Sequence, residues 1–280
     1  MEPRQSRLDV GLPEIDLAQR WANYRVLRKS FVSATALASF HHCPVKPFLE
    51  RVLQAAGLDR ATWAMRQGLA AHEAFQSAAT AGAEPTPRTF REALHDGSFL
   101  VAVEYPLRDE RRMLRGIADV AFAAASQAHI VELKNARPPP TTDPTWGLPV
   151  RPEHALQLEL YGLLAREDFG ATPTLTLVYM QDASKADFLE STRTSGRPQD
   201  ALEALVESHP TWRPTAEHDA LLKQTIRELR RAERRPFLPQ PTHGDPARCG
   251  QCTMRAWCPR RLDRPGEFQH VSAALLERAT

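Results

Sequence analysis

The chain has 280 residues, 42% of them apolar and 25% charged, which is ordinary for a globular protein with a sizeable core. Its 36 basic and 34 acidic side chains give a net charge of +2, so any DNA-binding surface must be local. No stretch approaches the roughly 18 apolar residues of a membrane span, and the amino terminus lacks the apolar core of a signal peptide. We therefore expect a cytoplasmic protein without a membrane contact, in a compartment that keeps thiols reduced.

The first part of the chain predicts an extension, two helices and then a linker. Residues 1–30 are polar with weak periodicity and are interpreted as an amino-terminal extension. Ser33 is a candidate N-cap for a helix over 33–43, and residues 61–80 are rich in Ala and free of Pro. The linker that follows, residues 80–90, is rich in Pro and Gly.

Three strand-like segments come next, followed by a helix and a fourth strand. The strands are predicted over 98–107, 112–124 and 128–136, with short polar breaks typical of hairpins. After a Pro-rich loop (137–152), helical spacing over 153–167 leads to a strand over 172–182. Residues 190–215 give no clear pattern, and 216–235 predict a basic helix. The order α-β-β-β-α-β predicts an α/β fold, with an antiparallel meander and a fourth strand added after a helical crossover.

Two neighbouring predicted strands carry charged side chains of the kinds that bind metal ions and catalyse hydrolysis. Glu132 and Lys134 are two apart and share one face of a strand, while Val131 and Leu133 point to the other face. Asp119 on the preceding strand joins them if the hairpin register allows. Two carboxylates beside a lysine suit Mg²⁺ or Mn²⁺, and phosphodiester hydrolysis needs such a cation and a nearby positive charge. The alternative is an exposed Glu–Lys pair worth roughly 0–1 kcal/mol.

The four cysteines indicate a metal centre. Cys249, Cys252 and Cys258 follow a C-x₂-C-x₅-C spacing, whereas Cys43 stands alone near the start of the chain. Four thiolates can complete either a tetrahedral Zn²⁺ site or an iron–sulfur cluster. Cys₄ zinc sites commonly combine two C-x₂₋₄-C pairs, which the one-plus-three split here does not provide.

The D…E-x-K set on this strand order resembles the PD-(D/E)xK nuclease superfamily, specifically its RecB-like branch. "GLAAHEAF" is similar to the branch's helix with a metal-binding histidine, which implies His72 as a ligand beside Asp119 and Glu132. "QLELY" is similar to its Q-x-x-x-Y motif, which implies Gln157 and Tyr161 as supporting residues. Ala118 precedes the Asp where the family name has Pro. The resemblance implies a restriction-endonuclease-like core with a mixed central sheet.

The cysteine spacing is similar to that of RecB-like nucleases in which one cysteine precedes the core and three follow it around a [4Fe–4S] cluster. The resemblance therefore implies Cys43, Cys249, Cys252 and Cys258 as cluster ligands. It also implies four segments: an extension (1–30), a nuclease domain (31–240), an iron–sulfur segment closing onto the core (241–262) and a tail (263–280). The stand-alone CRISPR-associated exonucleases are the most similar subgroup. They imply an Mg²⁺- or Mn²⁺-dependent exonuclease on single-stranded DNA or DNA ends, with a CRISPR integrase complex as a partner.

Other interpretations stay open beside this one. A phage, repair or helicase-associated RecB-like nuclease shares the same motifs, and a non-catalytic DNA-end-binding iron–sulfur subunit belongs to a different class. For DNA contacts we consider an arginine stripe on the helix over 216–235, balanced by interspersed Glu residues: Arg227, Arg230, Arg231, Arg234 and Arg235. Trp146, in the loop after the lysine strand, is a candidate for stacking on unpaired bases.

Overall fold

The computed structural model describes residues 14–15, 31–55, 73–80, 89–180, 197–234, 239–267 and 271–272. The chain divides into two compact units, which are treated separately. The sheet unit consists of Phe31–His41 and Ala61–Arg227, and the cysteine unit consists of Met1–Ser30, His42–Arg60 and Glu228–Thr280. Among the described residues, no helix combines the length and the apolar character that crossing a bilayer requires.

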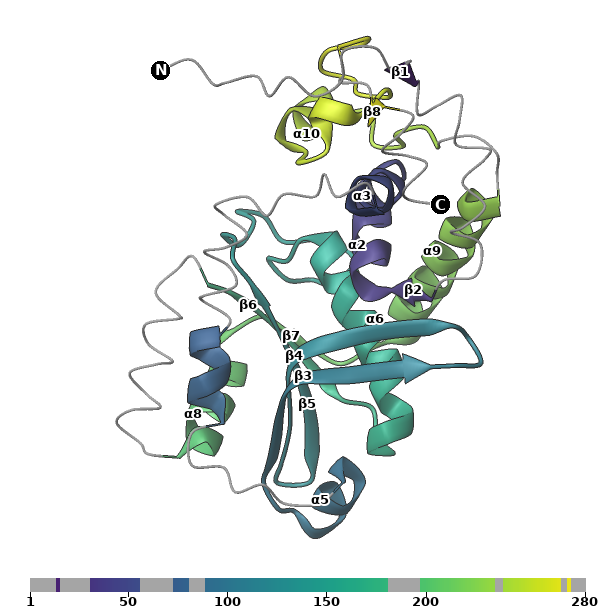
Figure 1. Ribbon diagram of the computed structural model, residues 1–280. Coiled ribbons are helices and arrows are strands. Elements are labelled where there is room, and N and C mark those ends of the chain that lie inside the picture. The colour runs from purple at the N-terminus through teal and green to yellow at the C-terminus, as the bar shows by residue number, and fades with distance from the viewer. Residues whose placement is uncertain are drawn as a thin grey trace. The chain divides into compact units, whose positions relative to one another are not determined.

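A mixed sheet forms the centre of the sheet unit, as predicted (Figure 1). Strands β3 (Leu100–Asp109), β4 (Leu114–Ala124) and β5 (Gln127–Lys134) form an antiparallel meander. Helix α6 (Pro152–Phe169) then returns the chain so that β6 (Thr174–Tyr179) pairs parallel with β5. Two short strands complete the sheet: β2 (Val32–Ser33), parallel to β4, and β7 (Thr211–Trp212), antiparallel to β6.

The two faces of the sheet follow from the alternation of side chains along its strands. Val120 and Phe122 of β4 and Val131 and Leu133 of β5 pack on one face, in a core shared with α8 (Pro198–Ser208) and the helical residues 73–79. The alternate positions, Asp119, Glu132 and Lys134 among them, therefore belong to the opposite face. There α6 covers the sheet, and its residues 155–162 are buried all round, as expected of a helix within a core.

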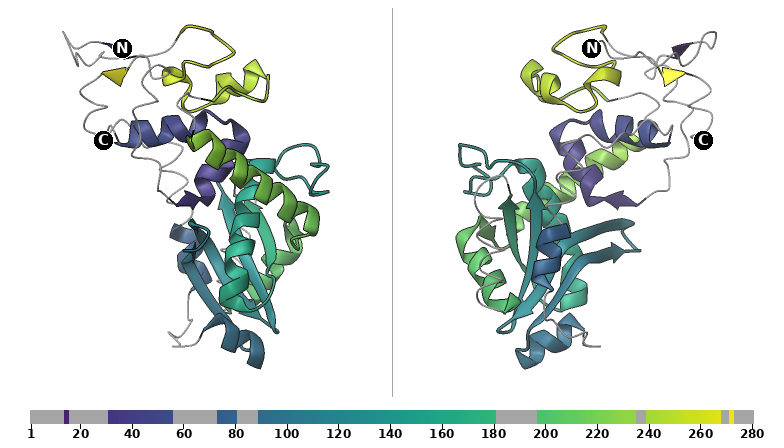
Figure 2. Two further views of the ribbon diagram at one scale, coloured as in Figure 1. Left: turned by 90° about the vertical axis from the view of Figure 1, so that its right-hand side faces the viewer. Right: turned by 60° about the vertical axis from the view of Figure 1, so that its left-hand side comes forward.

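Two helices of the sheet unit begin with side-chain caps. Ser33 Oγ accepts the backbone N–H of Ala36 at 3.1 Å, which confirms Ser33 as the start signal of α2 (Ala34–His42). Helix α5 (Phe90–Asp96) was not predicted. Its Thr89 and Glu92 form a reciprocal capping box, and α5 lies at the end of the sheet where β3 begins (Figure 2).

The cysteine unit contains short elements that bring distant segments together. Helix α3 (Lys46–Ala55) follows Cys43, while α10 (Pro246–Gln251) and a 3₁₀ turn (Arg255–Trp257) carry the late cysteines. Strands β1 (Glu14–Ile15) and β8 (Val271–Ser272) pair antiparallel. The basic helix α9 spans Ala216–Arg234, of which residues 216–227 belong to the sheet unit and residues 228–234 to the cysteine unit.

Candidate active site and cysteine pocket

The register of the β4–β5 hairpin sets Asp119 against Glu132. Val120 pairs with Val131, so the next positions along the two antiparallel strands, Asp119 and Glu132, face each other on the α6 side of the sheet. Lys134 lies two residues beyond Glu132 on that same side. The structure thus brings together the three residues predicted to converge.

The sheet opens at Asp119. The pairing of β4 with β5 ends at Val120. At the next position the Asp119 side chain bonds to β5 in place of the backbone, with Oδ2 accepting the backbone N–H of Leu133 at 2.7 Å. On its other side, β4 pairs with β3 at Val103 and Tyr105 but not at the intervening Glu104, whose φ is 48°. A left-handed backbone is uncommon for a residue with a side chain. The distortion of β3 and the end of the β5 pairing thus coincide at one carboxylate.

A hydrogen-bond chain links the two strands to α6. Lys134 Nζ donates to Glu132 Oε1 at 2.5 Å and to Gln157 Oε1 at 2.8 Å. Gln157 Nε2 donates in turn to Glu132 Oε1 and to the hydroxyl of Tyr161, each at 2.8 Å. Because an ammonium group only donates, the Gln157 atom facing Lys134 must be its oxygen, which fixes the amide orientation. Every polar atom of the Gln157 amide is therefore engaged.

Tyr161 can lie over β4 only because residue 116 is glycine. A Cβ atom on Gly116 would stand 2.4 Å from Cε1 and 2.7 Å from Cδ1 of Tyr161. The tyrosine is 3% exposed, and this burial holds its pKa well above the usual value of 10, so the hydroxyl stays protonated. "RGIAD" in the sequence gives no sign of this contact.

The surroundings of Glu132 disfavour the charged form of its carboxyl group. Both donors reach Oε1, while Oε2 is buried without a hydrogen-bond partner among the described residues. Burial, and after it the negative charge of Asp119, raise the pKa of Glu132 to about 8, against the opposing effect of Lys134. In a metal-free protein near neutral pH, this carboxyl therefore tends to keep a proton.

Asp119 and Glu132 supply two carboxylates of the kind that bind a divalent cation. A cation would supply positive charge at Glu132 Oε2, which has no hydrogen-bond partner among the described residues, and hard carboxylate oxygens are the ligands of Mg²⁺ and Mn²⁺. Within the described part of the chain, however, no three His, Cys, Asp or Glu residues form a ready ligand group. The predicted third ligand, His72, lies outside the described residues. Gln76, which is described, donates to the Asp119 carbonyl at 3.5 Å.

A second buried carboxylate, Glu159, lies on the far side of α6, and no sequence motif indicates it. Glu159, 1% exposed, accepts Trp212 Nε1 at 2.7 Å and lies 2.8 Å from His218 Nδ1. Trp146 packs against His218 with ring centroids 5.6 Å apart and is 7% exposed. The prediction that Trp146 offers a face to a nucleic-acid base is therefore wrong, because the ring is buried and anchors the loop after β5.

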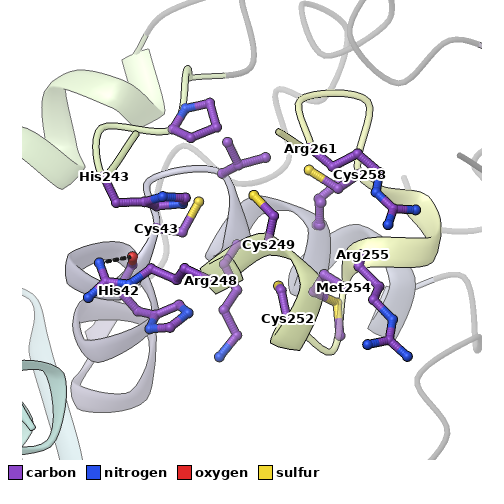
Figure 3. A pocket seen from close by; sticks show the side chains of 14 residues that line it. His42, Cys43, His243, Arg248, Cys249, Cys252, Met254, Arg255, Cys258 and Arg261 are labelled. Atoms are coloured by element: carbon purple, nitrogen blue, oxygen red, sulfur yellow. Dashed lines mark hydrogen bonds between the residues drawn. The ribbon is translucent and has the colours of Figure 1, made fainter. Parts of the chain in front are cut away.

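The four cysteines line one pocket within the cysteine unit, with about 370 Å³ of empty space that includes open solvent (Figure 3). Cys43, Cys249 and Cys258 are buried and Cys252 is half-buried. Burial, as the largest cause, raises the pKa of the Cys43, Cys252 and Cys258 thiols, that of Cys258 to about 12. Cys43, which is far from the other cysteines in the sequence, therefore lines the same pocket as they do.

The surroundings of this pocket are basic. Lys46, Arg248, Arg255 and Arg261 line it. Arg248 Nη1 donates to the backbone carbonyl of His42 at 3.2 Å, so the neighbours of Cys249 and Cys43 are directly joined. Among the described residues, no three His, Cys, Asp or Glu side chains, these cysteines included, form a group that could hold a metal ion.

The arginines of α9 are arranged as the spacing predicts. Arg227, Arg231 and Arg234 are exposed and Arg230 is half-buried, opposite the buried Leu222, Ile226 and Leu229. Of the interspersed acids, Glu233 pairs with Arg51 at 2.7 Å. Arg235 lies outside the described residues.

Comparison with known proteins agrees with this geometry. The family model of the PD-(D/E)XK nuclease superfamily matches residues 78–259, well over half of the chain. The matched range includes the two strands and the helix of the candidate site, and Cys249, Cys252 and Cys258. No curated protein matches significantly. The crystal structure of SSO0001 is similar over 88% of this chain and 96% of its own, with 13% identity and a TM-score of 0.45, too distant a likeness to bear on function.

Proposed function

The chain belongs to the PD-(D/E)XK nuclease superfamily, and from that membership we propose that it is a metal-dependent nuclease that hydrolyses DNA, acting as an exonuclease on single-stranded DNA or DNA ends. The observation that carries the proposal is the set of Asp119, Glu132 and Lys134 on one sheet face, tied by Gln157 to Tyr161. A homologue that had lost hydrolysis would have no need to keep two facing carboxylates, one of them buried, beside a lysine.

Each side chain has a role that its contacts support. Asp119 and Glu132, with His72, would hold the cation. The chemistry that Mg²⁺ or Mn²⁺ supplies when bound is charge neutralisation at the phosphate and a lowered pKa of water. Lys134 commits two N–H groups to Glu132 and Gln157, and its third can donate to a phosphate oxygen or to the attacking water. Gln157 and Tyr161 fix the position of that ammonium group.

The cysteine pocket is assigned a [4Fe–4S] cluster with Cys43, Cys249, Cys252 and Cys258 as ligands. Four thiols that line one cavity support this assignment. Because ligation requires thiolates and burial raises the pKa of three of these thiols, cluster binding would have to release their protons. Iron and acid-labile sulfide in anaerobically purified protein, lost on Cys43→Ser substitution, test it. Zinc in place of iron would overturn it.

DNA contacts and cellular role extend the same proposal. The exposed Arg227, Arg231 and Arg234 of α9 are suited to a phosphate backbone, which dominates binding that does not depend on sequence. A role in CRISPR adaptation beside an integrase complex stays a prediction, as do a phage, repair or helicase-associated role.

The experiment that tests the proposed function compares end-labelled single-stranded, end-labelled duplex and circular single-stranded DNA in Mn²⁺, in Mg²⁺ and in EDTA. We expect Mn²⁺- or Mg²⁺-dependent loss of the linear single strand, resistance of the circle, and no activity from Asp119→Asn. Glu207→Gln, at an exposed position of α8, is the matched control. If cluster-loaded wild-type protein and Asp119→Asn bind DNA equally and neither cuts it, the protein is a DNA-end-binding subunit instead.

A further inference from the structure

Helix α6 presents a third polar residue on the face that carries Gln157 and Tyr161. His154 precedes these two by three and seven positions, so all three lie along one side of the helix. His154 is half-buried, whereas Gln157 and Tyr161 are buried, so the row runs from the interior towards solvent. No motif used in the sequence reading includes His154.

Tyr179 places His154 at the lysine end of the site. In the β5–β6 pairing Tyr179 is the partner of Lys134, and paired residues project to the same side of a sheet. The rings of His154 and Tyr179 have centroids 5.8 Å apart, and His154 Nδ1 lies 3.4 Å from the tyrosine hydroxyl. The histidine therefore lies beside the strand position that faces the lysine.

The hydrogen bonds around Tyr179 favour one tautomer of the histidine. The backbone N–H of Arg151 donates to the Tyr179 hydroxyl at 2.9 Å, so the oxygen is an acceptor there. Burial raises the pKa of Tyr179 to about 12, so the hydroxyl keeps its single proton and can donate it to Nδ1. An imidazole that accepts at Nδ1 carries its own proton on Nε2.

We propose that His154 is a substrate-binding residue of the nuclease site, whose Nε2–H donates to a non-bridging phosphate oxygen of the DNA strand. The proposal rests on the proposed function and deepens it. Its position in the first turn of an 18-residue helix adds a favourable local potential for an anion, and the exposed Arg151 adjoins it. His154 thus extends the site from the reacting phosphate towards a neighbouring one.

Steady-state cleavage of a labelled single-stranded oligonucleotide at saturating Mn²⁺ tests this. His154→Ala is expected to raise KM about tenfold or more, the loss typical of a hydrogen bond to a charged group, and to change kcat by less than about threefold. His154→Gln, which can return an N–H donor near the position of Nε2, should recover part of the loss, and Tyr179→Phe should raise KM less than His154→Ala. His95→Gln, at an exposed position of α5, is the control.

Two results would overturn the proposal while leaving the proposed function intact. In one, wild-type protein cleaves DNA, Asp119→Asn does not, and His154→Ala has an unchanged KM. In the other, His154→Ala shifts the Mn²⁺ concentration for half-maximal rate as much as KM, which would make the histidine part of the cation site. Absence of Asp119-dependent cleavage in wild-type protein would instead refute the proposed function.

Discussion

Replacing Glu132 with Gln should stabilise the metal-free protein while abolishing its activity. Glu132 is 3% exposed, its Oε2 has no donor within the described part of the chain, and Asp119 faces it across the hairpin. Glutamine keeps an oxygen for Lys134 and Gln157, carries no charge and can donate its amide towards Asp119. The substitution therefore removes the electrostatic cost of the site and leaves its shape nearly unchanged.

The size and the pH range of the effect follow from the carboxyl itself. Its pKa is about 8 in the folded protein, against a usual value of 4.5. Between these pH values the folded state binds more protons than the unfolded state, so the wild-type free energy of unfolding falls as pH rises. At 1.36 kcal/mol for each pKa unit, the loss is about 3 kcal/mol at pH 7. The cost is absent below pH 4.5 and complete above pH 8.

Urea unfolding in EDTA, from pH 5 to pH 8.5, measures this directly. Glu132→Gln and wild type should have similar free energies of unfolding at pH 5, and the variant should be more stable by about 3 kcal/mol at pH 7. Mn²⁺ should stabilise wild type at pH 8 and leave the variant unaffected. Glu207→Gln should follow wild type throughout. A difference between Glu132→Gln and wild type that does not grow with pH would refute the reasoning.

Two further substitutions test contacts around the site. Gly116→Ala should displace Tyr161, lower kcat about tenfold and cost about 1–3 kcal/mol in urea unfolding, with Tyr161→Phe as the comparison; unchanged kcat would show that the tyrosine contact is not needed. Glu159→Ala leaves the indole N–H of Trp212 buried without its acceptor and removes the carboxylate beside His218, so it should cost about 1–3 kcal/mol of unfolding free energy; a loss below about 1 kcal/mol would contradict this anchoring role.

The sequence predicted what depends on local periodicity and missed what depends on packing. The alternation along 112–136 placed Glu132 and Lys134 on one face and Val131 and Leu133 on the other, and the register then brought Asp119 opposite Glu132. The spacing of Gln157 and Tyr161 likewise predicted a shared helical face. These relations need only the strand and helix repeats.

The missed features rest on long-range contacts or on short signals. The need for Gly116 follows from the Tyr161 ring, 45 positions further along the chain, and the Trp146 ring packs against His218, 72 positions further along. The α5 helix does carry a local signal, the T-x-x-E of its capping box, but the Pro and Gly content of residues 80–90 predicts a linker up to Phe90. Helix α8 begins at Pro198, within a stretch whose polar composition hides the apolar spacing of Ala201, Leu202 and Leu205.

The proposed function requires that the carboxylates and lysine of the β4–β5 hairpin hydrolyse DNA. The most direct measurement is the single-turnover cleavage rate of end-labelled single-stranded DNA in Mn²⁺ by wild type and Lys134→Ala, at enzyme concentrations that saturate binding of both. We expect a rate at least about 100-fold lower for Lys134→Ala, the loss expected when a stabilising charge is removed. Equal cleavage rates for the two proteins would contradict the proposed function.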